Sequence, residues 1–81
     1  MSPEDLLREC RMAHASGLDF PTTWRKVIRI HPLVAGPAMQ MAYRGRVWLE
    51  VPLITGHRIA HDSKTGFTLI RPVENRPVGS Q

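Results

Sequence analysis

The chain has 81 residues, of which 42% are hydrophobic and one is cysteine, and its formal net charge is +4. This length allows a single domain, which buries only about 60–65% of its unfolded surface. One cysteine excludes an internal disulfide framework, and no apolar run approaches the roughly 18 residues that a membrane span needs. The acidic, amphipathic start is unlike a signal peptide, so we expect a cytoplasmic protein without membrane contact.

The first predicted element is a helix over residues 2–17. Ser2 can cap it, Pro3 suits its first position, and Asp5 completes a capping-box pattern. Gly17 suits a left-handed cap at its end. Its apolar side consists of Leu6, Leu7, Cys10, Ala13 and His14.

A second helix is predicted over residues 20–31. Its apolar stripe has helical spacing and consists of Phe20, Trp24, Val27, Ile28 and His31. Thr22, Thr23 and the basic residues fall on its other side. Pro32 ends this helix, because proline disfavours a helical residue before it and cannot donate a hydrogen bond.

Three glycines about ten residues apart predict a four-stranded antiparallel meander in the second half of the chain. Each glycine closes a three-residue loop, since the last loop residue is left-handed and glycine adopts that conformation without steric cost. The loops are Tyr43-Arg44-Gly45, Ile54-Thr55-Gly56 and Lys64-Thr65-Gly66.

The loop lengths also predict the strand register and therefore the two faces of the sheet. Met41 lies opposite Val47, Leu53 opposite His57, and His61 opposite Leu69. The predicted inner face carries Met39, Met41, Val47, Leu49, Val51, Leu53, Ile59, Phe67 and Leu69. The predicted outer face carries Gln40, Arg46, Trp48, Glu50, Arg58, Ala60, Asp62, Thr68 and Ile70.

The predicted fold is α+β, with two N-terminal helices packed on one face of the four-stranded meander. Residues 1–71 form this domain, and residues 72–81 are expected to be a flexible C-terminal tail. A winged helix-turn-helix is the alternative, with a third helix over residues 37–44. Residues 38–42 fit either a helix or a strand by composition, and we favour a strand because they pair in register with the next one.

Basic residues are concentrated in the middle of the chain. Residues 21–46 contain Arg25, Lys26, Arg29, Arg44 and Arg46 and no acidic residue. Such a stretch fits a polyanion or an acidic protein surface. The alternative is that these cations have no binding role. They would then increase solubility, or interact favourably with the helix dipole where they lie in a last helical turn.

Trp48 is the unusual member of the predicted outer face, where Arg46 and Arg58 also lie. An indole beside arginines is typical of a platform that stacks bases, or of an anchor that binds protein. The competing interpretation is that the tail or a second copy of the chain covers Trp48, or that it only pairs with a neighbouring strand.

No pattern in the chain points to catalysis, a metal or a cofactor. Cys10 and His14 are four apart on one helix, but this spacing equally places both on its buried stripe. His57 and His61 are roughly 13 Å apart along a strand, too far for one ion. There is no phosphate-binding glycine loop, nucleophile elbow or carboxylate pair.

We therefore expect a small non-enzymatic binding module. The leading hypothesis is nucleic-acid binding through the basic residues with stacking by Trp48. The alternative is a protein-interaction module, such as a small regulator or inhibitor of the kind that phage and mobile elements encode, which uses the sheet face around Trp48. A homodimer fits either function. The predicted binding residues are Arg25, Lys26, Arg29, Arg44, Arg46, Trp48 and Arg58.

Overall fold

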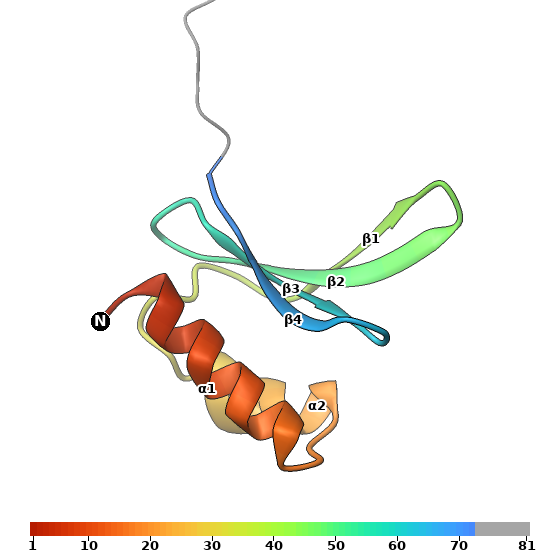
Figure 1. Cartoon of the computed structure of the whole chain (residues 1–81). Helices are drawn as coiled ribbons and strands as arrows, with labels where there is room; N and C mark the ends of the chain where they lie inside the picture. Colours follow the sequence, from red (N-terminus) through yellow and green to blue (C-terminus); the bar gives the residue numbers. More distant parts are fainter. Residues whose placement is uncertain (73–81) are drawn as a thin grey trace, which may run out of the picture.

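The computed structural model describes residues 1–72 as two layers, with all helices on one face of a sheet (Figure 1). The helices are α1 (Pro3–Ala15), α2 (Phe20–Thr23) and the π-helical segment η1 (Trp24–Ile28). The strands are β1 (Met39–Tyr43), β2 (Arg46–Pro52), β3 (Arg58–Asp62) and β4 (Gly66–Ile70). They form an antiparallel meander in the order β1-β2-β3-β4, so the α+β prediction is confirmed. The winged-helix alternative is wrong, because β1 occupies the place of its third helix.

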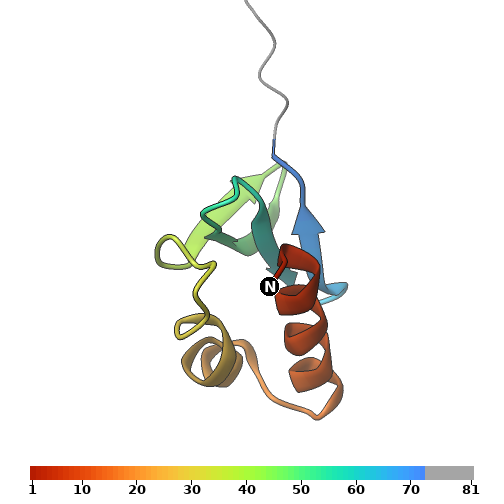
Figure 2. The same cartoon turned by 90° about the vertical axis from the view of Figure 1, so that its left-hand side faces the viewer.

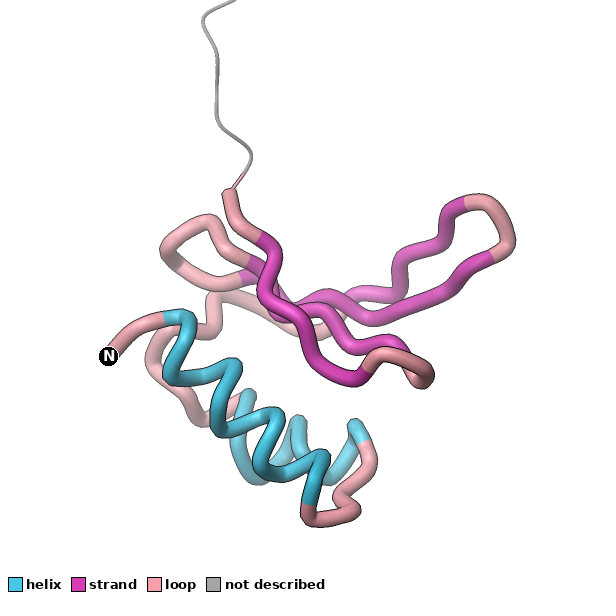
Figure 3. The backbone as a smooth tube through the Cα atoms, in the orientation of Figure 1, coloured by secondary structure: helices cyan, strands magenta, loops and turns pink. Residues whose placement is uncertain are grey.

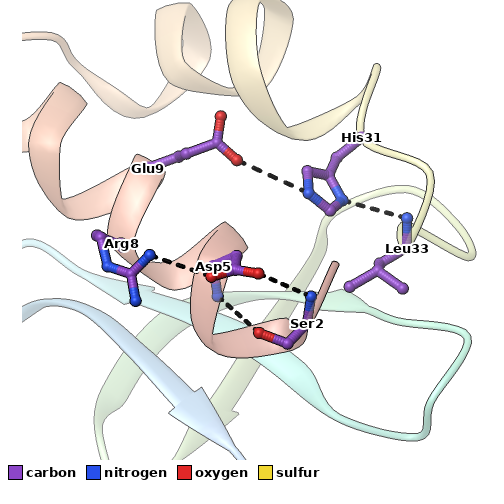
Figure 4. Close-up of polar contacts among 6 residues, drawn as sticks. All are labelled: Ser2, Asp5, Arg8, Glu9, His31 and Leu33. Carbon is purple, nitrogen blue, oxygen red and sulfur yellow. Dashed lines mark hydrogen bonds and ion pairs between the residues drawn. The ribbon is translucent and has the colours of Figure 1, made fainter.

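Helix α1 begins at the predicted capping box (Figure 4). The Ser2 hydroxyl accepts from the Asp5 amide at 3.2 Å, and the Asp5 carboxylate accepts from the Ser2 amide at 3.1 Å. These bonds satisfy amides that a helix start otherwise leaves free, and they lower the pKa of Asp5. Gly17 follows the helix with φ +88°, as predicted.

The second helical segment begins at Phe20, as predicted, but ends at Ile28, three residues before the predicted end. Asp19 caps it by accepting from the Thr22 amide at 2.9 Å. Thr23 lies on the buried side rather than the predicted polar side, and its hydroxyl donates to the Asp19 carbonyl at 2.9 Å. That local hydrogen bond offsets the desolvation cost of burying the Thr23 hydroxyl.

The connector between the helices and the sheet, residues 29–38, is held in place by polar contacts at two points. The His31 ring accepts from the Leu33 amide at 3.2 Å, and its other nitrogen lies 3.7 Å from the Glu9 carboxylate on α1 (Figure 4). Further along, the Ala35 amide donates to the Pro52 carbonyl at 2.9 Å. The connector therefore runs beside the end of β2 and fixes the helical layer against the sheet.

The core lies between the two layers. Its buried side chains are contributed by α1, η1 and the three strands next to the helices. They are Leu6, Cys10, Ile28, Val51, Leu53, Ile59 and Phe67, with Phe20 and Trp24 packed partly buried against them. The four apolar core residues from the second half of the chain, Val51, Leu53, Ile59 and Phe67, were all predicted on the inner face.

The register of the first hairpin differs from the prediction. Met41 lies opposite Trp48 rather than Val47, because the loop has two residues, Arg44 and Gly45, instead of three. Both have positive φ, at +50° and +77°, which is the type I′ geometry. A shift of one residue moves every β1 side chain to the other face.

The predicted faces of β1 are therefore wrong. Met39 and Met41, predicted to point toward the helices, lie on the outer face with Trp48. Gln40, predicted on the outer face, lies opposite Leu49 on the inner face. The outer face is consequently more apolar than expected.

The other two hairpins preserve the predicted faces. The Leu53 amide donates to the His57 carbonyl at 2.9 Å, as the predicted second loop requires. In the third hairpin Asp62 lies opposite Gly66, so the loop is 63–65 and His61 lies opposite Phe67 rather than Leu69. This shift moves the register by two positions and leaves the inward and outward sides unchanged.

The β1–β2 hairpin extends beyond the helices, as the ribbon and tube views both show (Figures 1 and 3). The view along the other direction shows the helices on one side of the twisted sheet (Figure 2). Near the hairpin tip Tyr43 is 62% exposed and Val47 is 55% exposed.

In the described part of the chain, no helix has the length and apolar character to cross a membrane. The predicted tail lies outside the described residues, apart from Pro72.

Candidate binding surface

The predicted binding residues fall into two groups that the fold separates. Arg25 and Lys26 lie in η1, and Arg29 directly follows it. All three are exposed, and the Arg29 guanidinium donates to the Arg25 carbonyl at 3.2 Å. The helical layer covers the inner face of the sheet, whereas Arg46, Trp48 and Arg58 lie on its outer face. The seven residues therefore do not form one continuous surface.

Arg46 forms an ion pair across the outer face. Its guanidinium lies 2.8 Å from the carboxylate of Asp62 on β3. The Lys64 amide donates to the same carboxylate at 2.8 Å. These two contacts hold the pKa of Asp62 below its ordinary value, with the backbone bond the larger cause. One predicted cation is thus partly neutralised.

Trp48 and Arg58 meet at a buried carboxylate. The Trp48 indole nitrogen donates to Oε2 of Glu50 at 2.6 Å, and a guanidinium nitrogen of Arg58 lies 3.0 Å from Oε1. Glu50 is only 3% exposed, and Oε1 lacks a well-directed hydrogen bond despite the close cation. A buried carboxylate needs compensating partners. Arg58 and the Trp48 N–H are therefore committed to holding Glu50.

Arg44 sits at the tip of the β1–β2 hairpin. Its guanidinium lies over the ring of Tyr43, 5.3 Å from the ring centroid. Such a cation–π contact is worth about 0.5–1 kcal/mol at an exposed site. In the part of the chain that the structure describes, no carboxylate forms an ion pair with Arg44.

Two hollows, each of about 190 Å³, flank the Arg46–Asp62 pair. One lies on the outer face beside Trp48, over Ala60 and Thr68. The other lies between the two hairpin tips, beside Gly45 and Lys64. We call the exposed end of the sheet around them the tip surface, which consists of Tyr43, Arg44, Arg46, Trp48 and Lys64.

The tip surface contains two residues that the sequence interpretation missed, Tyr43 and Lys64. Lys64 was assigned only to a loop, although it comes close to Arg46 once the meander folds. Tyr43 was also assigned to a loop, because the two-residue turn was not recognised. No local signal marks this turn, because arginine is not one of the residues that usually precede glycine in a type I′ turn.

The residues considered for metal or nucleophilic chemistry lie in different parts of the fold. Cys10 lies in the core and His61 at its border, whereas His57 lies next to the second hairpin turn and His14, predicted on the buried stripe, is exposed. Cys10 is fully buried, and burial raises the pKa of its thiol to about 12, which disfavours the reactive thiolate. His14 and His61 have ring centroids 6.2 Å apart and pack with Phe67. Among residues 1–72, no three histidine, cysteine or acidic side chains are grouped so as to hold a metal ion.

No protein-family model, curated protein or solved structure matches this chain. Functional inference therefore rests on the chemistry of the surfaces. Of these, the tip surface combines aromatic rings and hollows with two cations, Arg44 and Lys64, that form no ion pair among residues 1–72.

Proposed function

We propose that this protein binds nucleic acid through the tip surface. The observation that carries the proposal is the concentration of cations at this end of the sheet. Arg46 and Lys64 line one hollow with a single carboxylate, that of Asp62, and Arg44 lies at the tip of the adjoining hairpin. Arginine and lysine side chains bind phosphates without needing one fixed geometry. The aromatic ring of Tyr43 supplies a face on which a base can stack.

The shape of the hairpin supports the same function. A two-stranded β-ribbon is narrow enough to enter the major groove of duplex DNA. The β1–β2 hairpin extends past the helices, so its tip can reach a groove or a strand without the helical layer colliding (Figure 1). Single-stranded and duplex nucleic acids are both compatible with this surface, and the choice between them is a result of the test.

Binding is tested by fluorescence anisotropy with duplex DNA, single-stranded DNA and RNA, starting at about 50 mM salt. The test variant is Arg44→Asn with Lys64→Gln, because asparagine keeps the left-handed turn while the charge is removed. The matched control is Arg25→Gln with Lys26→Gln, which removes the same charge from η1.

The proposal expects the test variant to lower the slope of log affinity against log salt by roughly 1.4–1.8, for two lost phosphate contacts. The control variant should change the slope far less. Absence of binding to all three probes at the lowest salt would overturn the proposal, and so would equal losses in the two variants.

A second candidate function, protein interaction through the outer face, is favoured by one observation. Met39 and Met41 lie on this face beside Trp48, and Met39 is 46% exposed. Exposed apolar side chains around an indole are typical of protein-binding sites. The partner would be an acidic protein surface, which the arginines would steer into place. Met39→Gln should then weaken that association and leave nucleic-acid affinity unchanged.

A further inference from the structure

The two edges of the sheet differ in how they are covered. Strand β4 lies alongside α1, and the Arg11 guanidinium donates to the Phe67 carbonyl of β4 at 3.3 Å. Strand β1 forms the other edge, and within residues 1–72 no strand pairs with its outer side. An open edge presents backbone donors and acceptors to any strand that can pair with them.

Strand β1 also lacks the devices that usually protect an open edge. Natural edge strands carry charges, prolines or bulges that prevent pairing. The sequence of β1 is Met-Gln-Met-Ala-Tyr, without a charge or a proline, and it pairs with β2 without a bulge. Its end residues are exposed to solvent, Met39 at 46% and Tyr43 at 62%.

The turn geometry determines which backbone groups face this edge. In a two-residue hairpin the residues that flank the turn, here Tyr43 and Arg46, form a hydrogen-bonded pair. Such pairs alternate along an antiparallel ladder, so Met41 also bonds to β2. The amides and carbonyls of Gln40 and Ala42 therefore point away from β2, toward the open edge.

We propose that two copies of this chain join through their β1 edges, antiparallel about a two-fold axis at Met41. Strand β1 is bounded by Pro37 on one side and by the turn on the other, and Met41 is its central residue. In this register Gln40 of one copy exchanges main-chain hydrogen bonds with Ala42 of the other. The edge is thus self-complementary, as a two-fold interface must be.

Side chains on the outer face are also compatible in this arrangement. Met41 packs against Met41 of the second copy in a non-hydrogen-bonded pair, where side chains come closest. Met39 packs against Tyr43 of the second copy. Arg44 lies opposite Ala38, so no like charges face each other. A short chain gains stability from such an interface, because it buries little surface alone.

The experiment measures the mass of the full-length protein by analytical ultracentrifugation over a range of concentrations, without nucleic acid. The variants are Met41→Lys and Met41→Glu, each alone and in an equimolar mixture. Because Met41 faces itself across the axis, each variant alone opposes like charges, whereas the mixture pairs opposite ones. Thr68→Lys is the control, since Thr68 is exposed on β4, away from the β1 edge. Circular dichroism checks that every variant is folded.

The wild type and Thr68→Lys should have twice the mass of one chain, each Met41 variant alone half of that, and the mixture should recover the dimer. A wild type that stays monomeric to millimolar concentration would overturn the proposal. So would a dimer that persists in Met41→Lys alone, or a mixture that stays monomeric. No nucleic acid is present, so the outcome is independent of the proposed function.

Discussion

Two arginines of the outer face, Arg46 and Arg58, have different structural roles, although both were predicted as binding residues because of their charge. Arg58 and Arg46 are both outer-face arginines in ion pairs, but their partners differ in burial. The Glu50 side chain is 4% exposed, whereas the Asp62 side chain is 16% exposed and its cation, Arg46, is 69% exposed. Buried and exposed pairs have very different energetic consequences when they are broken.

Arg58→Ala should therefore lower the free energy of unfolding by about 2–3 kcal/mol, because it leaves a buried carboxylate without its cation. Arg46→Ala should cost at most about 1 kcal/mol. Urea denaturation measures both. Adding Glu50→Gln to Arg58→Ala should restore part of the loss, and equal losses in the two single variants would contradict the assignment.

His61 should make stability depend on pH. Burial lowers the pKa of His61, His14 lowers it further, and Asp62 opposes the shift. The unfolded chain then takes up the proton at a higher pH than the folded chain, with a pKa near 6.5. The contribution of neutral His61 to the free energy of unfolding is therefore fully present above about pH 6.5 and is lost as the pH falls below that value.

Thermal unfolding at about pH 7.5 and pH 5 measures this dependence. The melting temperature should be lower at the acidic pH, and His61→Leu should reduce the difference. His57→Gln is the control, because His57 contacts Thr55 in the second hairpin loop and not the aromatic cluster. A difference that is unchanged in His61→Leu would exclude this residue as its source.

At the scale of elements, the first hairpin turn sets the register of β1 and therefore determines which of its side chains lie on the outer face. Arg44 adopts φ +50°, a conformation that costs a residue with a side chain roughly 1 kcal/mol. Arg44→Asn should therefore be more stable than Arg44→Ala by about 0.5–1 kcal/mol, since both variants lose the contact with the Tyr43 ring and asparagine is preferred at this position of a type I′ turn. Urea denaturation measures the difference, and an asparagine variant no more stable than the alanine variant would argue for another turn.

Features set by neighbouring residues were predictable from the sequence. The cap of α1 needs only Ser2 and Asp5, and the second hairpin loop needs only Gly56. The β1 register was not predictable in this way, because arginine rarely adopts positive φ and a three-residue loop placed only Gly45 there. The turn is recognised only from the structure, where Met41 pairs with Trp48.

The candidate site was predictable only in part. Arg46 and Trp48 were predicted on the outer face and Arg44 in the first hairpin loop, and the structure places them there. The β2–β3 register was predicted correctly, but the ion pairs of Arg58 with Glu50 and of Arg46 with Asp62 also depend on side-chain conformations, which the sequence does not give. Lys64 joins the tip surface because the third hairpin brings it near Arg46.

At the scale of the whole molecule, the helices and the exposed hairpin are segregated. The helices cover the buried part of the sheet and one of its edges, and the β1–β2 hairpin extends from the opposite edge (Figure 1). This segregation leaves the tip surface and the β1 edge accessible. Nucleic-acid binding is proposed at the tip of this hairpin and self-association along its open edge. Tyr43 belongs to both sites, and both depend on the two-residue turn.

The most direct test of this account is the pattern of Hα–Hα nuclear Overhauser effects between β1 and β2 in solution. Non-hydrogen-bonded pairs bring Cα atoms to about 4.5 Å and give strong signals. We predict strong signals for Ala42 with Val47 and for Gln40 with Leu49. Strong signals for Met41 with Val47 or for Met39 with Leu49 would contradict it, because the methionines would then face the helices.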